Sequence, residues 1–176
     1  MPITVEEKAE LSRNALLSDL PSSSSQEYEW FLSDLKTAFL IKDWIEETPY
    51  DKMVSRYNIW PGDVHNIIEI AEWLLHAIRE FARMYSFSCV SKVSDVIIRV
   101  HNGCKHELLN LISLKGIGRV RARAIFNEGF KTINDLRGVP VERIANIKTI
   151  GKAIATNIKN QIGESENIGN KELGEF

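Results

Sequence analysis

Apolar residues recur at intervals of three and four along most of the chain, a spacing typical of helices that bury one face. Between residues 26 and 47 this spacing predicts one helix, which Pro49 ends. No stretch alternates apolar and polar residues over five or more positions, as a half-buried strand does. The pattern therefore predicts an all-α protein. Further helices are expected over residues 5–20, 51–57, 64–85 and 93–100.

The segment 105–163 is built from one unit used twice. Each copy consists of a helix, a short turn and a second helix. Aligning the copies pairs Gly118 with Gly151, and the apolar Ile117 with Ile150. This is the helix–hairpin–helix pattern in a duplicated form, so we expect a helical bundle followed by a small helix–hairpin–helix domain. The turns are 114–118 and 147–151, and the helices are expected over 105–113, 119–127, 141–146 and 152–162.

Composition divides the chain near Gly103. Residues 1–100 carry 10 lysines and arginines against 16 acids, whereas residues 101–163 carry 11 against 4. A basic segment within a chain of net charge −2 indicates that one part engages an anionic partner. The expected organisation is an N-terminal helix and serine-rich linker over 1–25, a helical bundle over 26–103, the helix–hairpin–helix domain over 104–163 and an acidic flexible tail over 164–176.

The first hairpin suits a phosphate group. Gly116 and Gly118 flank one apolar residue, so the backbone can come close to a ligand and point its N–H groups at it. The next helix begins at once, which adds the amides and the positive dipole end of its first turn. Such contacts reach phosphate rather than base edges, so they favour binding without sequence preference. The glycine pair alone is also compatible with a plain tight turn between packed helices.

The cations around the hairpins favour the phosphate interpretation. Arg119 and Arg123 share one helical face, where we expect them to grip phosphates, while Arg121 points elsewhere. In the second copy Thr149 replaces the first glycine, so we expect weaker contacts there. The expected DNA-binding residues of this domain are Lys115, Gly116, Gly118, Arg119, Arg121, Arg123, Lys148, Gly151 and Lys152.

Several activities lack a motif in this chain. It has no G-x-x-x-x-G-K-[ST], no H-E-x-x-H and no C-x-x-C, so no catalytic residues are assigned and no phosphate-binding loop for ATP is predicted. His101, Cys104 and His106 lack a fourth zinc ligand, so we expect no metal site. Neither a signal peptide, a membrane span nor a disulfide framework is predicted. We therefore expect a cytoplasmic, nucleoid-associated location.

The strings at 30–33, 42–47, 61–63, 71–74, 105–109 and 117–123 occur in an order that resembles the C-terminal region of the archaeal Ski-type superfamily-two DNA helicases, the HELQ-like family. The resemblance covers roughly residues 27–163. It implies a helical bundle with a long ratchet helix, followed by a small helical domain. The family moves 3′ to 5′ on single-stranded DNA using ATP, through motor domains that are absent here. The resemblance therefore implies no cofactor in this chain, and ATP and magnesium only where motor domains are present.

The resemblance also implies a DNA contact outside the hairpins. The ratchet helix would span 63–85, and the family stacks a tryptophan on a base at the position of Trp73. The family has an arginine seven residues earlier, where this chain has Asn66, which lacks the charge of a guanidinium. A core tryptophan beside Leu74 is the alternative for Trp73.

The predicted function is a DNA-binding accessory module for DNA repair or replication, without a motor of its own. Its expected partners are single-stranded or forked DNA, helicase motor domains or repair proteins, and no membrane. The alternative is a protein–protein docking or dimerisation module of a DNA repair complex. The acidic residues 1–100 would suit that alternative better than a DNA-binding role.

Overall fold

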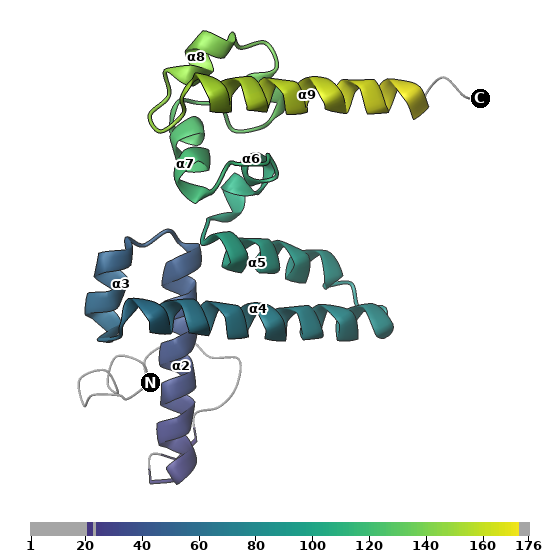
Figure 1. The fold of residues 1–176 in the computed structure, drawn as a ribbon. Helices are drawn as coiled ribbons and strands as arrows, with labels where there is room; N and C mark the ends of the chain where they lie inside the picture. The colour runs from purple at the N-terminus through teal and green to yellow at the C-terminus, as the bar shows by residue number, and fades with distance from the viewer. Residues whose placement is uncertain (1–20, 23, 173–176) are drawn as a thin grey trace. The chain divides into compact units, whose positions relative to one another are not determined.

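The fold is entirely helical over the part of the chain described by the computed structural model, which comprises residues 21, 22 and 24–172 (Figure 1). The expected all-α class and the helix–hairpin–helix domain after a helical region are confirmed. The chain divides into two compact units, and the boundary between them lies between His101 and Asn102. No helix in the described part is long and apolar enough to span a bilayer. The helix expected over 5–20 lies outside the described residues.

The first unit contains four described helices, and their buried faces form one core. Trp44 on α2 donates its indole N–H to the carbonyl of Val100 on α5, at 2.7 Å. The phenol of Tyr57 on α3 donates to Asp43 of α2 at 2.9 Å, and burial and this bond raise its pKa. These bonds fix α3 and α5 to α2. The helices are α2 (Gln26–Ile45), α3 (Tyr50–Tyr57), α4 (Pro61–Met84) and α5 (Val90–Asn102).

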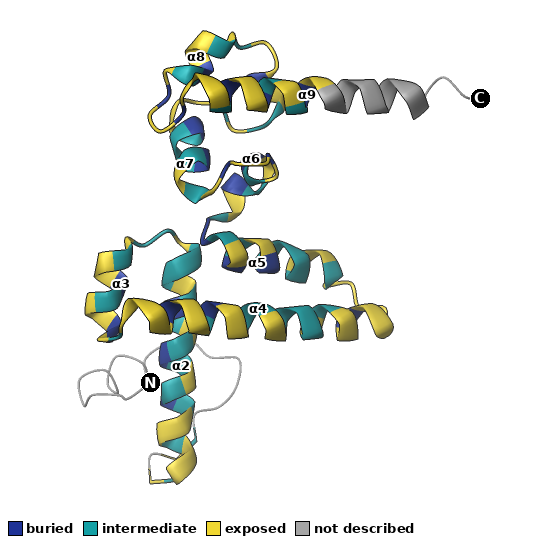
Figure 2. Cartoon of the chain, in the orientation of Figure 1, coloured by how far each residue is buried: buried dark blue, intermediate teal, exposed yellow. Residues whose placement is uncertain are grey.

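Helix α4 begins slightly earlier than the spacing of apolar residues indicated. Pro61 occupies its first position, where a missing N–H costs nothing. The carboxylate of Asp63 accepts a hydrogen bond from the amide of Trp60 at 3.0 Å and so closes the first turn. The buried residues of α4 lie mainly in its first two turns (Figure 2). Its second half therefore has one largely uncovered face.

The second unit carries the duplicated pattern around one continuous core. Its helices are α6 (Leu109–Ile112), α7 (Arg119–Asn127), α8 (Val141–Ala145) and α9 (Lys152–Glu172), with the short 3-10 helices η1 (His106–Leu108) and η2 (Asn134–Leu136). Ile117 and Ile150 are 4% and 3% exposed, so each hairpin anchors one side chain in the core. The duplication is thus a structural one, with both turns packed on the same apolar centre.

In the second unit, two elements differ from the sequence expectation. The first helix of the unit is not continuous over 105–113, because η1 and α6 share that span. Helix α9 passes through Gly163 and ends at Glu172, although the sequence led us to expect a helix end near 162 and a flexible tail over 164–176. An isolated glycine costs a helix only about 1 kcal/mol relative to alanine, so it is a weak stop signal.

Candidate nucleic-acid interface

The first hairpin turns through one left-handed residue. Gly116 has φ +82°, a conformation that side chains other than glycine rarely adopt. The amide of Ile117 donates to the carbonyl of Leu114 at 3.1 Å, which closes the turn while the Ile117 side chain enters the core. Gly118 follows as the N-terminal cap of α7. The turn therefore delivers the chain to the start of a helix with its backbone exposed.

The second hairpin has the same turn hydrogen bond and the same left-handed position as the first. The amide of Ile150 donates to the carbonyl of Ile147 at 2.9 Å. Thr149 has φ +72°, so it holds the left-handed conformation that glycine holds in the first copy. We expected the second hairpin to be weaker because it lacks this glycine. The structure shows that the turn itself is retained, at the cost of a strained threonine.

Both hairpins leave amide groups at the start of the following helix. The carbonyls of Gly118 and Gly151 accept the first helical bonds, from Ala122 and Ala155, both at 3.0 Å. The amides of the same two glycines donate to no group in the described part of the chain. Helix dipoles add positive potential there. Each hairpin therefore offers oriented donors to an anion.

The backbone conformation of Gly118 does not require glycine. Its φ is −86°, which any residue adopts, and a Cβ built on it meets no atom within 4 Å. Gly116 is the residue whose conformation requires glycine. A side chain at position 118 would therefore matter only to a ligand that approaches the backbone closely.

The three arginines of α7 each contact another group of the protein. Arg123 pairs with Glu107 of η1 at 2.7 Å and lies over the ring of Phe126. Arg119 lies on the same side, with its guanidinium 3.4 Å from the carbonyl of Gly103. The two arginines do share a face, but that face packs on the start of the unit. The ion pair holds the guanidinium of Arg123 against Glu107, and a phosphate contact by Arg123 stays a prediction.

Arg121 lies between the two hairpins. Its Nη1 donates to the carbonyl of Gly116 at 2.8 Å, and its Nε donates to the carbonyl of Thr149 at 3.4 Å. A shallow surface depression at this point is lined by Gly118, Arg119, Val120, Arg121 and Thr149. Arg121 was expected to leave the face that Arg119 and Arg123 share, and its side chain lies against both hairpins.

Gln161 on α9 contacts the first hairpin, and sequence reasoning missed it. Its side-chain amide accepts a bond from the amide of Lys115 at 2.8 Å and donates to the carbonyl of the same residue at 3.1 Å. A glutamine on the polar side of a helix carries no sequence signal for this role. Only the packing of α9 beside the first hairpin reveals it.

Exposed lysines surround the hairpins. Lys115 and Lys148 occupy equivalent places before the two left-handed residues, and Lys152 begins α9. All three are exposed, and none pairs with a carboxylate in the described part of the chain. Their charge is therefore available to a ligand that meets the hairpin amides.

The second region predicted to contact DNA lies on α4, in the first unit. Trp73 is 70% exposed, so it does not belong to the core, which was the alternative interpretation. Asn66 is also exposed and lies seven residues earlier, about two turns away on the same face. Further exposed apolar residues of this helix are Ile70, Leu74, Ile78, Phe81 and Met84.

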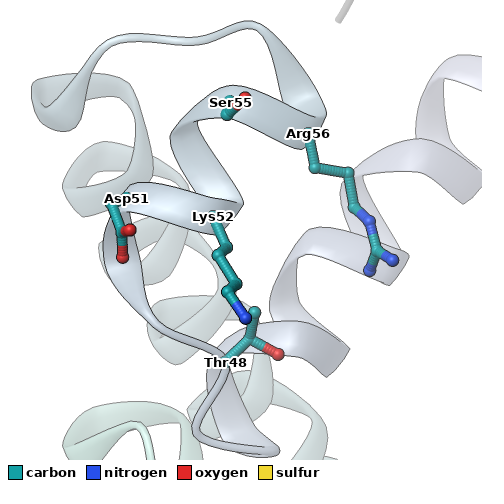
Figure 3. A pocket seen from close by; sticks show the side chains of 5 residues that line it. All are labelled: Thr48, Asp51, Lys52, Ser55 and Arg56. Carbon is teal, nitrogen blue, oxygen red and sulfur yellow. The ribbon is translucent and has the colours of Figure 1, made fainter.

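Polar side chains also line pockets in the first unit. Figure 3 shows a surface pocket in which Lys52 extends toward Thr48, whereas Asp51 and Arg56 point to opposite sides. Arg56 is already paired with Asp43 at 2.7 Å. His101, one of the candidate zinc ligands, contacts Glu72 at 2.8 Å. Within the described residues, no three histidine, cysteine or acidic side chains are placed to hold a metal ion.

The comparisons with known families match the two units separately. Residues 3–103 match the model described as archaeal helicase, domain 4, which covers more than half of the chain. The chain belongs to this family. Residues 108–164 match a second model, the SAM-like helix-hairpin-helix tandem. The archaeal helicase resemblance and the duplicated hairpin are thereby confirmed.

Curated relatives share both units. The chain is 38% identical over 149 residues to the ATP-dependent DNA helicase Hel308 of Methanocella arvoryzae. It is 33% identical over 159 residues to the protein of the same name from Thermococcus kodakarensis, and 36% over 140 residues to that from Pyrococcus abyssi. The matches cover 84%, 89% and 78% of this chain but only 20%, 14% and 20% of the relatives. The chain thus corresponds to a C-terminal part of these helicases.

Proposed function

We propose that this chain is a DNA-binding accessory module of a DNA helicase and that it holds the phosphate backbone without reading sequence. The observation that carries the proposal is the repeated hairpin. Two turns of the same geometry each expose backbone amides at the start of a helix, beside lysines that pair with no carboxylate among the described residues. Phosphate is the anion that DNA presents at regular spacing, and amide and lysine contacts to it are independent of base identity.

The finer assignment concerns which DNA is held and by which residues. In the second unit the proposed contacts are the amides of Gly116, Gly118 and Gly151, with the side chains of Lys115, Lys148 and Lys152. Arg119 and Arg121 lie at the rim of the same surface. On α4 we propose that Trp73 stacks on an unpaired base, because a planar side chain exposed on a helix face suits single-stranded or forked DNA.

The module would serve a motor that it does not contain. A relative of which the match covers only 20% carries the name ATP-dependent DNA helicase, so ATP and magnesium belong in this proposal to motor domains outside the matched region. Attachment to chromosomal DNA would place the protein at the nucleoid. The docking alternative is not favoured, because the helicase and hairpin family models both match.

The test is the salt dependence of DNA binding by the full chain. Fluorescence anisotropy would follow labelled single-stranded and duplex oligonucleotides of three unrelated sequences. Contacts to three to five phosphates predict a log–log slope of roughly −2 to −3.5 for the single strands. The affinities should also be similar for all three sequences. No binding at low salt, or a slope near zero, would overturn the proposal.

A further inference from the structure

The two hairpins of the second unit are tied to each other in a reciprocal way. Arg121 belongs to the helix that follows the first hairpin, and it donates to the carbonyl of Thr149 in the second. Gln161 belongs to the helix that follows the second hairpin, and it bonds the backbone of Lys115 in the first. Each helix therefore holds the turn of the other copy.

The atoms used by these ties are mostly carbonyl oxygens. Arg121 donates hydrogen bonds to the carbonyls of the two left-handed residues, Gly116 and Thr149. Gln161 donates one to the carbonyl of Lys115. Carbonyl oxygens repel phosphate, so fixing them on protein donors removes groups that oppose anion binding. The amides of Gly118 and Gly151 are left without a protein acceptor in the described part of the chain.

We propose that Arg121 and Gln161 are positioning residues that fix the two hairpins relative to each other, so that both bind phosphates of one DNA molecule at the same time. This inference rests on the proposed function. Two weak sites held at a fixed distance bind one ligand far more tightly than two sites that move independently. Arg121 suits the task because its planar fork directs several donors at once, whereas a lysine ammonium is a single point charge.

The geometry of the Arg121 side chain and its charge can be tested separately. Arg121→Lys keeps the positive charge but cannot hold two carbonyls in one plane. Gln161→Leu removes no charge at all and keeps a side chain of similar size. Asn160→Leu is the matched control, since Asn160 is an exposed neutral amide on the same helix that makes neither of these ties.

The experiment measures DNA affinity of the full chain at several salt concentrations by anisotropy, with thermal melts alongside. We expect Arg121→Lys and Gln161→Leu each to weaken binding about tenfold and to reduce the magnitude of the salt slope by about 1, because one hairpin no longer engages its phosphates. Asn160→Leu should behave as the parent does. A loss of slope in Gln161→Leu is decisive, because that change removes no charge.

Failure of the positioning role and failure of the proposed DNA-binding function would give different results. If the parent binds DNA and both variants keep its salt slope, the positioning role is wrong, even if their melting temperatures fall. A fall in melting temperature alone would show a structural role. If the parent chain does not bind DNA, the proposed function fails, and this inference fails with it.

Discussion

Gly116 and Thr149 occupy equivalent positions in the two hairpins and share a left-handed backbone, with φ of +82° and +72°. Glycine adopts this conformation at no steric cost, whereas a β-branched residue is strained there by about 1–2 kcal/mol. The strain is tolerated because Ile150 is buried and the turn bond from its amide is kept. The same turn is thus built from two residues of opposite preference.

Replacing Thr149 by glycine should stabilise the protein. The change relieves the steric strain but adds about 0.5–1 kcal/mol of backbone entropy loss, so the net gain is about 0.5–1 kcal/mol. Urea denaturation of the parent and of Thr149→Gly measures it. The reverse change, Gly116→Thr, is the matched control and should destabilise by about 0.5–1 kcal/mol, because the same two terms act with opposite sign. A stability loss in Thr149→Gly would contradict the strain argument.

Gly118→Ala should reduce DNA binding and leave the fold nearly unchanged. The added methyl meets no protein atom within 4 Å and the backbone angle is ordinary, so the stability loss should stay below about 1 kcal/mol. The methyl would instead occupy the place of an approaching phosphate. Gly138→Ala is the control, because it also adds a Cβ in open space but lies outside both hairpins. Equal affinities for the two variants would remove the Gly118 amide from the interface.

Arg123→Ala should affect stability more clearly than DNA binding. The change removes a partly exposed ion pair with Glu107 and the contact with Phe126, worth together about 1 kcal/mol. A double-mutant cycle with Glu107→Ala, followed by thermal melting, isolates the ion pair. Lys148→Ala is the comparison for binding, since it should lower DNA affinity and leave the melting temperature unchanged. A larger loss of affinity in Arg123→Ala than in Lys148→Ala would contradict this prediction and show that Arg123 contacts phosphate.

Trp73→Ala should weaken binding to single strands and spare binding to duplex. Stacking on an unpaired base is worth about 1–3 kcal/mol, and a paired base offers no free face to the ring. Because Trp73 is 70% exposed, the melting temperature should hardly change. Trp30→Ala is the control, since Trp30 is 61% exposed on a different helix. Fluorescence anisotropy measures the affinity for both kinds of DNA. Equal losses of affinity for single strand and duplex would exclude stacking.

Asn66→Arg should increase affinity for single-stranded DNA. The position is exposed and lies on the face of Trp73, so a guanidinium placed there can reach a phosphate of the same strand. The expected change is a steeper salt slope by about 0.7 with no loss of stability. Asn66→Gln provides the neutral control. An unchanged slope in Asn66→Arg would indicate that DNA does not follow this face of α4.

The helices were predictable because each carries a strong local pattern. The spacing of apolar residues predicted α2 and α4 to within a few positions, and the duplicated Ile–Gly pairs predicted both hairpins. Glycine content misled in one place, since Gly163 lies within α9. Nothing in the residues around η1 indicated that a helix would be interrupted there.

The partners of side chains were not predictable to the same degree. The helical period correctly placed Arg119 and Arg123 on one face, but it did not show that Glu107 lies opposite that face. Nor did it show that Arg121 reaches a turn 28 residues away. Such pairs depend on how distant segments pack, and the sequence of one helix does not show which residues of another segment lie beside it. Gln161 was missed for the same reason.

The bond between Lys115 and Gln161 joins residues 46 positions apart. It can therefore form only after the later of the two residues has been synthesised. A chain emerges from the ribosome N-terminal end first, so the first hairpin is made well before α9. Until α9 forms, the loop at Lys115 lacks its partner, and closing so long a segment carries an entropic cost. The hairpin that is translated first is consequently completed last, together with the end of its own domain.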